Sequence, residues 1–154
     1  TLSSSSAASD VYKRQVLKLS HKVYVPHWAT KGFFVKINGR DMKADAVPGS
    51  YLTISRRWRK GDTVELRMPF RFYLEPLMDQ QNIASLFYGP VLLAAQEPEA
   101  RTDWRRVTLD AQDISKSITG DPSKPEFAID GVVFKPFFDT YGRHSVYLDV
   151  VLMQ

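Results

Sequence analysis

The chain has 154 residues, of which 44% are hydrophobic, enough for one ordinary domain or two small ones with a buried core. Its formal charge of +4 is a mild excess that is not concentrated as a nucleic-acid-binding face requires, so we expect no nucleic-acid partner. The absence of cysteine excludes disulfides, thiolate zinc ligands and a cysteine nucleophile; no apolar run approaches the roughly 18 residues of a membrane-spanning helix, so we expect no membrane partner.

The first fifteen residues differ in texture from the rest of the chain. Ser5 to Gln15 read SSAASDVYKRQ, which is the in-frame translation of a transposase-type sequencing adapter. We therefore expect residues 1–15 to be a non-native, disordered leader and the native sequence to begin near Val16, inside a longer gene. A natural leader rich in Ser and Ala is the alternative. On the adapter interpretation, an upstream part of the protein is missing, and the compartment stays open.

The first half of the native sequence alternates polar and apolar residues with a period of two, which indicates β-strands. The runs end at turn signals such as Pro26, Asn38-Gly39 and Pro48-Gly49. The last run, residues 63–68, alternates strictly, so we expect it to have one solvated and one buried face. The predicted strands are residues 16–25, 33–37, 41–46, 51–55 and 63–68.

After Pro69 the sequence changes to near-continuous apolar runs. Residues 83–88 and 91–95, separated by Gly89-Pro90, are typical of two strands buried on both faces, or of one kinked strand. A polar link, residues 97–104, follows, and residues 110–118 are predicted to form a short helix with Asp110 as its cap. The remaining predictions are a hairpin of residues 126–129 and 132–137 around Asp130-Gly131, and a final strand at residues 145–152.

Many short strands with almost no helix predict an all-β fold, an antiparallel β-sandwich or jelly roll. The change in hydrophobic pattern after residue 70 indicates that the chain has two domains. We expect a first β-sandwich domain over residues 16–72 and a second, small C-terminal β domain over residues 73–154.

The carboxylates form no recognisable catalytic motif. Glu75 and Asp79 lie between predicted strands, and their spacing is not that of a glycosidase acid/base pair, so we interpret them as surface charges. The best polar cluster is Asp139 with Arg143 and His144, which is most simply a loop held by an ion pair. We therefore predict no catalytic residue in this chain.

The three histidines, His21, His27 and His144, show no metal-ligand spacing. His21 falls on the apolar face of its strand and is interpreted as a core or rim residue. We therefore predict no metal-binding and no cofactor-binding residue, and no resident cofactor.

Exposed aromatic side chains are the remaining functional candidates, because an aromatic ring can stack on a sugar ring. Trp104, Trp28 and Trp58 are the candidate sugar-stacking residues. Trp28 and Trp58 lie in or near predicted strands, where a core role competes with a binding role. Trp104 lies in the polar link, where neither role is favoured.

Several phrases of the sequence, taken together, resemble the β-L-arabinofuranosidase family, glycoside hydrolase family 127. Their order along the chain is that of the family, and they span nearly all of residues 16–154. The phrases are VYVPHWA at 23–29, VKING at 35–39, PGSYLTISRRWRKGDTVELRMPF at 48–70, NIASLFYGPVLLAA at 82–95 and FKPFFDTYGRHSVYLDV at 134–150. Leu148 departs from the family, where Trp is usual, and so does Phe138, where Tyr is usual.

The resemblance implies an enzyme with a large helical toroid that performs the chemistry, followed by β-sandwich domains. It also implies that residues 16–72 are a truncated middle β-sandwich domain, because the earlier strands of that domain should precede Val16. In that family a zinc ion with cysteine ligands and a glutamate acid/base lie in the toroid, and no position of this chain matches their motifs. The expected partner is therefore the missing helical catalytic domain of the same protein, and zinc belongs to that domain.

These observations leave three functions open. The first is a non-catalytic accessory region of a glycoside hydrolase. The second is an autonomous carbohydrate-binding module for plant polysaccharide, which would present coplanar aromatic residues on an open face. The third is a protein-interaction sandwich. A broad apolar patch would indicate the accessory region.

Overall fold

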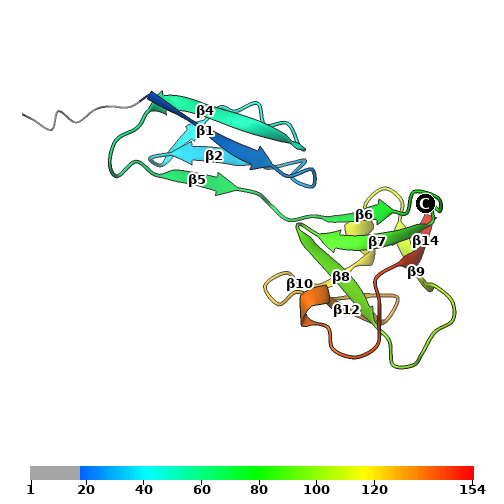
Figure 1. The fold of residues 1–154 in the computed structure, drawn as a ribbon. Coiled ribbons are helices and arrows are strands. Elements are labelled where there is room, and N and C mark those ends of the chain that lie inside the picture. The colour runs from blue at the N-terminus through cyan, green and yellow to red at the C-terminus, as the bar shows by residue number, and fades with distance from the viewer. Residues whose placement is uncertain (1–17) are drawn as a thin grey trace, which may run out of the picture. The chain divides into compact units, whose positions relative to one another are not determined.

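The computed structural model describes residues 18–154, and the expected leader at residues 1–15 lies outside them. The predicted all-β fold is confirmed: strands dominate, and the only helices in the described part are two short 3₁₀ turns. The described chain divides into two compact units (Figure 1). The first unit contains residues 18–26 and 33–67, and the second contains residues 27–32 and 68–154. Among residues 18–154, no helix is long and apolar enough to cross a membrane.

The first unit is built from two small antiparallel sheets. Strands β1 and β4 pair along their whole length, so that Lys18 lies opposite Arg57 and Val25 opposite Ser50. The second sheet has the order β3-β2-β5. The strands are β1 (Lys18–Val25), β2 (Phe34–Ile37), β3 (Arg40–Met42), β4 (Ser50–Arg57) and β5 (Val64–Arg67). The returning strand predicted for residues 41–46 is thus shorter than expected, because β3 ends at Met42 and residues 43–49 form no strand.

The core of the first unit is small. Among its described residues, the buried hydrophobic side chains are Val25, Val35 and Ile54. The prediction of one buried face for residues 63–68 is wrong for β5, all four of whose residues are exposed. Alternation alone gives a strand an apolar face, but a second layer must cover that face before it is buried.

The second unit contains one large sheet, whose main path has the order β10-β11-β12-β8-β7-β14-β9. Strand β6 pairs with β7, and β13 pairs with β8. Its elements are β6 (Phe72–Pro76), β7 (Ile83–Tyr88), β8 (Val91–Gln96), β9 (Arg105–Asp110), η1 (Ile114–Ser117), β10 (Thr119–Asp121), β11 (Glu126–Ile129), β12 (Val132–Pro136), η2 (Phe137–Asp139), β13 (His144–Ser145) and β14 (Leu148–Met153).

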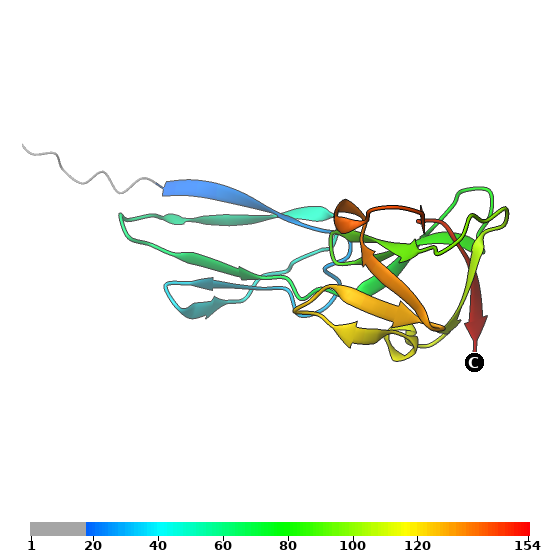
Figure 2. The same cartoon turned by 90° about the horizontal axis from the view of Figure 1, so that it is seen from below.

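The hairpin of β7 and β8 is the centre of this sheet. The two strands pair next to their turn, from Leu86 opposite Leu93 to Tyr88 opposite Val91. Further from the turn, residues 144–149 lie between them, because β13 pairs with the end of β8 and β14 with the start of β7. The sheet curls as a result, and Figure 2 shows its strands running around the core in different directions.

The core of the second unit lies inside this curled sheet. Leu86, Leu93 and Phe134 are fully buried at its centre, and Phe72 and Tyr88 pack against it. Alternate residues of the same strands, Phe87 and Leu92 among them, point to the outer face. The alternative of two strands at residues 83–88 and 91–95 is confirmed, and burial on both faces holds for residues 83–86 and 93–95, whereas the residues next to the turn are half-buried.

Two local predictions in this unit need correction. The helix expected at residues 110–118 is only the 3₁₀ turn η1, and Asp113 rather than Asp110 is its cap. Asp110 instead ends β9 and accepts backbone hydrogen bonds from Gln112 and Asp113. Most strand pairs are antiparallel, as expected, and β14 and β9 form a parallel pair.

The segment of residues 27–32 packs within the second unit. Ala29 is buried, and the ring of Trp28 meets Phe70 edge-on at 5.3 Å. Phe70 in turn lies against Gly89, where an added Cβ would come within 2.5 Å of the ring. The turn between β7 and β8 therefore requires glycine for space as well as for its φ of +56°.

Candidate functional site

A buried carboxylate, Glu97, lies where the chain leaves β8. Its Oε1 accepts hydrogen bonds from Arg105 Nε at 2.9 Å and from Ser145 Oγ at 2.9 Å, and its Oε2 pairs with Arg105 Nη2. Arg101 approaches the same carboxylate to 4.0 Å. Only 4% of the Glu97 side chain is exposed. Through these bonds Glu97 links the end of β8 to the start of β9, where Arg105 lies, and to β13, where Ser145 lies.

The electrostatics of Glu97 follow from these contacts. The hydrogen bond from Arg105 holds the pKa of the Glu97 carboxyl below its ordinary value, and burial opposes this only in part. The same bond raises the pKa of Arg105. Both groups are therefore charged at neutral pH, and Glu97 has no proton to donate to a leaving group. The arrangement suits a structural ion pair.

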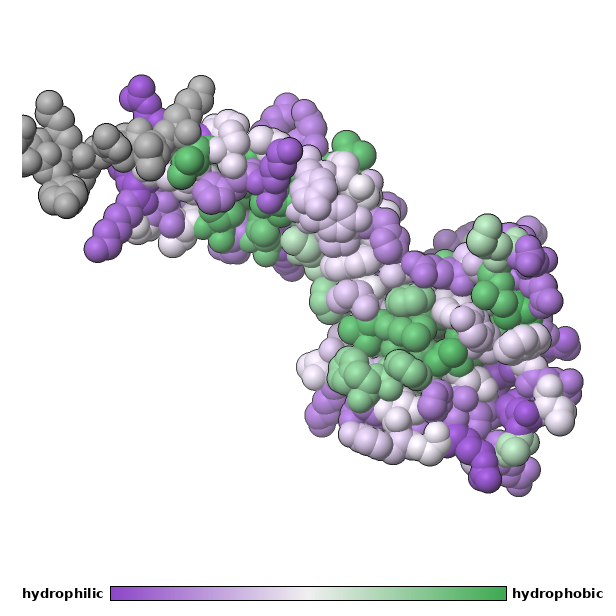
Figure 3. All heavy atoms as spheres, viewed as in Figure 1, coloured by the Kyte–Doolittle hydropathy of each residue, from purple (hydrophilic) through white to green (hydrophobic). Residues whose placement is uncertain are grey.

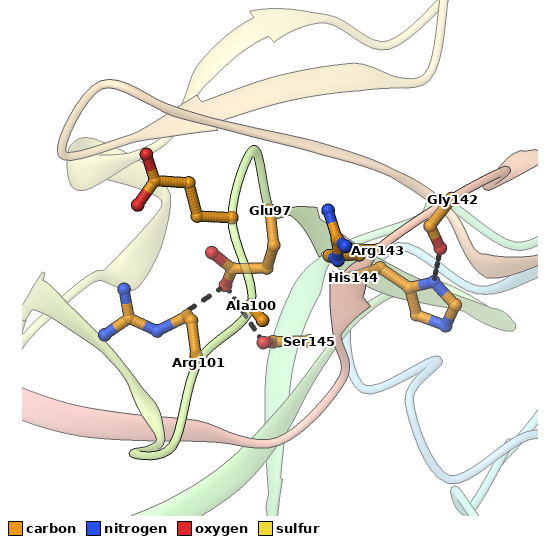
Figure 4. A pocket seen from close by; sticks show the side chains of 8 residues that line it. Glu97, Ala100, Arg101, Gly142, Arg143, His144 and Ser145 are labelled. Carbon is orange, nitrogen blue, oxygen red and sulfur yellow. Dashed lines mark hydrogen bonds and ion pairs between the residues drawn. The ribbon is translucent and has the colours of Figure 1, made fainter.

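A hollow of about 400 Å³ opens beside Glu97 (Figure 4). Its rim is formed by the loop after β8 and by the segment that leads into β13. His144 is held there by a 3.0 Å contact between its Nδ1 and the carbonyl oxygen of Gly142. The lining residues are Glu97, Glu99, Ala100, Arg101, Gly142, Arg143, His144 and Ser145.

A second hollow, of about 620 Å³, shares Arg101 with the first. It is lined by Arg101, Thr102, Asp103, Trp104, Arg106 and Asp149. Here the parallel register of β9 and β14 places Arg106 beside Asp149, and both Nε and Nη2 of Arg106 lie 2.8 Å from the same oxygen of Asp149, Oδ2. Asn82 Nδ2 donates to the other oxygen of Asp149 at 3.0 Å. These bonds from Asn82 and Arg106 lower the pKa of the Asp149 carboxyl.

The structure places the three candidate tryptophans in different settings. Trp28 is half-buried against Phe70. Trp58 is half-buried, and its indole N–H donates to the Leu19 carbonyl at 3.1 Å. Trp104 is 51% exposed at the second hollow and meets Tyr147 edge-on, with ring centroids 6.0 Å apart. Trp104 is therefore the candidate whose ring is most open to a ligand.

The other polar candidates lie apart from these hollows, except for Arg143 and His144. Glu75 is exposed and contacts His27 at 3.2 Å, and Asp79 is exposed. His21 is exposed and packs edge-on against Trp58 at 4.7 Å, so it is a rim residue. The ion pair expected for the Asp139 cluster is absent from the salt bridges of residues 18–154. Instead, the Arg143 carbonyl oxygen accepts from the Glu97 backbone N–H at 3.0 Å.

Sequence reasoning missed four residues of the site: Glu97, Arg105, Arg106 and Asp149. For Glu97 no signal existed, since a glutamate in a polar link is ordinarily exposed. For Arg105 and Arg106 a partial signal did exist, because Val107 and Leu109 alternate with polar neighbours and so indicate the strand β9 that carries both arginines.

Comparison with known proteins now adds to this geometry. The fold class is that of an all-β, sandwich-like protein, and two solved structures share it. One, described as a glycoside hydrolase, has a TM-score of 0.61 at 16% identity and covers 90% of this chain. The other, a GH127 β-arabinofuranosidase, has a TM-score of 0.57 at 18% identity and covers 88% of this chain. At these identities the likeness shows the fold alone.

A particular family is indicated by a match of the sequence. Residues 4–70 match the family model of the β-L-arabinofuranosidase GH127 middle domain. The matched range begins inside the expected leader and covers less than half of the chain. No curated protein matches the chain. The chain spans only 29% and 28% of the two solved structures, so it corresponds to less than a third of either.

Proposed function

We propose that this chain is a non-catalytic accessory region of a glycoside hydrolase resembling the GH127 β-L-arabinofuranosidases. The observation that carries the proposal is the match of residues 4–70 to the middle domain of that family. The similarity in fold to the two solved structures, which covers 90% and 88% of this chain, also supports the proposal. On this proposal a helical catalytic domain of the same protein performs the hydrolysis, and these residues cover and stabilise it.

An apolar patch on the second unit supports a covering role (Figure 3). It lies over β8 and η2. The helix η2 is held on the outer face of β8, because Gln96 Nε2 donates to Thr140 Oγ1 at 3.3 Å. Phe137 is half exposed there and Phe138 is 75% exposed. Burying a phenylalanine contributes about 1.5–3 kcal/mol, so a partner that covers both rings would gain substantially.

The occupant that fits this patch is the helical domain. The matched structures are more than three times as long as the region to which this chain corresponds, so ample protein exists in them to cover it. On this proposal the zinc implied by the family resemblance is held by the helical domain, because this chain has no cysteine to supply a thiolate ligand.

The accessory role predicts two results for the chain alone. First, it should not hydrolyse aryl β-L-arabinofuranosides, and turnover above buffer would contradict the proposal. Second, it should self-associate through the uncovered patch, as sedimentation velocity would show. Replacing Phe137 and Phe138 together by serine should yield a monomer. The matched control is Met78→Ser, which removes an exposed apolar side chain away from the patch; a parent chain that stays monomeric at high concentration would argue against a docking face.

A further inference from the structure

The outer face of β9 and β14 carries an aromatic pair beside a polar pair. In the parallel register Leu148 lies opposite Arg105 and Asp149 opposite Arg106. Because side chains alternate along a strand, Arg106 and Asp149 lie on the face opposite to Arg105 and Leu148. Trp104 precedes β9 and lines the same hollow as Arg106 and Asp149, and its ring lies 6.0 Å from that of Tyr147, which precedes β14. Arg105 points the other way, toward Glu97.

We propose that this face binds a neutral, hydroxyl-rich glycan, with a sugar ring stacked on Trp104 and its hydroxyls bonded to Arg106 and Asp149. The proposal rests on the geometry of the second unit and does not depend on the accessory role. Trp104 offers an exposed ring that lies nearly perpendicular to the ring of Tyr147, with the centroids 6.0 Å apart. An aromatic face next to planar polar side chains presents the two kinds of contact that a sugar makes, apolar C–H and polar O–H.

The polar groups are fixed before any ligand arrives. Asp149 is held by both Asn82 and Arg106, and only 19% of its side chain is exposed. Arg106 is 73% exposed and uses only part of its five N–H donors on Asp149. Donors and an acceptor are thus available in a set orientation, so little ordering is needed on binding.

The balance of charged side chains at the larger hollow favours a neutral ligand. The four charged side chains that line the larger hollow are Arg101, Asp103, Arg106 and Asp149, and their formal charges cancel. A phosphate or a polyuronate would require a net excess of cations, whereas hydroxyl groups require donors and acceptors in balance. The larger hollow is within the size range of ligand sites.

Affinity electrophoresis of the full 154-residue chain tests the proposal. Native gels would contain arabinoxylan, arabinogalactan or xyloglucan as neutral probes, and polygalacturonate as the acidic probe. We expect retardation by at least one neutral polysaccharide and none by polygalacturonate at physiological salt. Trp104→Ala should weaken the apparent affinity by about tenfold or more, a loss typical of a binding hot spot. Trp104→Phe should retain part of the binding, because it keeps a ring.

The controls separate a lost contact from a lost fold. Tyr51→Ala removes an exposed aromatic side chain of the first unit and should leave the retardation unchanged. Circular dichroism should be the same for all variants. The proposal is overturned if the parent chain migrates freely with every neutral probe, if only polygalacturonate retards it, or if Trp104→Ala is retarded like the parent. None of these outcomes bears on self-association through Phe137 and Phe138, so the accessory role is tested separately.

Discussion

Replacing Glu97 by glutamine is expected to destabilise the second unit by about 3 kcal/mol. The side chain of Glu97 is 4% exposed and that of Arg105 is 18% exposed. Removing one member of a buried ion pair costs about 3–5 kcal/mol, because the other charge stays buried without compensation. The lower end applies here, since Arg105 keeps some access to water. The amide would also turn an N–H group toward the guanidinium or toward Ser145.

Urea unfolding followed by tryptophan fluorescence measures this loss. A Trp58→Phe background leaves Trp28 and Trp104 as reporters, and both belong to the second unit. With a slope of about 1–3 kcal/mol/M, a loss of 3 kcal/mol lowers the urea midpoint by about 1–3 M. The matched control is the double replacement Glu97→Leu with Arg105→Met, which removes both charges and should cost less than the two single changes added together. A loss under about 0.5 kcal/mol for Glu97→Gln, as for an ordinary surface site, would refute the reasoning.

Two further predictions follow from the same unit. Because the folded pKa of Glu97 lies below its ordinary value of 4.5, its stabilising effect is present above about pH 4.5 and is lost as the pH falls through the lowered pKa. Unfolding free energies measured toward pH 3 should therefore fall less steeply in Glu97→Gln than in the parent, and parallel curves would contradict this. Gly89→Ala should cost about 2 kcal/mol more than Gly131→Ala in urea unfolding, because only the first places a Cβ against Phe70. Both glycines have positive φ, so equal losses would mean that the Phe70 ring moves aside at little cost.

The hairpins of this protein could be predicted because their determinants are local. Asn38-Gly39 and Asp130-Gly131 adopt positive φ at both residues, at 51° and 75° and at 52° and 76°. A tight turn of this kind needs a residue pair that tolerates left-handed backbone, and the sequence displays it directly. The alternation of polar and apolar residues in the strands that flank these turns is also a local feature, so the positions of those strands could be predicted from neighbouring residues alone.

The candidate site could not be predicted in this way because its contacts are distant in sequence. Glu97 is buried only because Arg105 and Ser145, 8 and 48 residues away, satisfy its oxygens. Asp149 meets Arg106 across 43 residues, through a parallel pairing that no turn signal announces. A side-chain period of two around Val107 and Leu109 was visible, and it would have put Trp104 and Arg106 on one face. The side chains that contact this face, Asp149 among them, come from β14, whose pairing with β9 could not be predicted.

Burial in the first unit shows why an amphipathic pattern is only a conditional prediction. Val64 and Leu66 alternate with polar residues on β5, yet both are exposed. Their strand belongs to a three-stranded sheet. The pattern states which face would be buried if a layer covered it, and the covering layer is a property of the whole fold.

The two functional inferences rest on different residues of the chain. The family match ends at residue 70, and its described part lies mostly in the first unit, which has the smaller core. The residues proposed to bind a glycan, Trp104, Arg106, Tyr147 and Asp149, all follow that range. The family match therefore gives no support to glycan binding, and loss of binding in Trp104→Ala would give none to the accessory role. An accessory region that both covers an apolar surface and holds a glycan requires both results, since the apolar patch at Phe137 and Phe138 and the face at Trp104 and Arg106 consist of different residues.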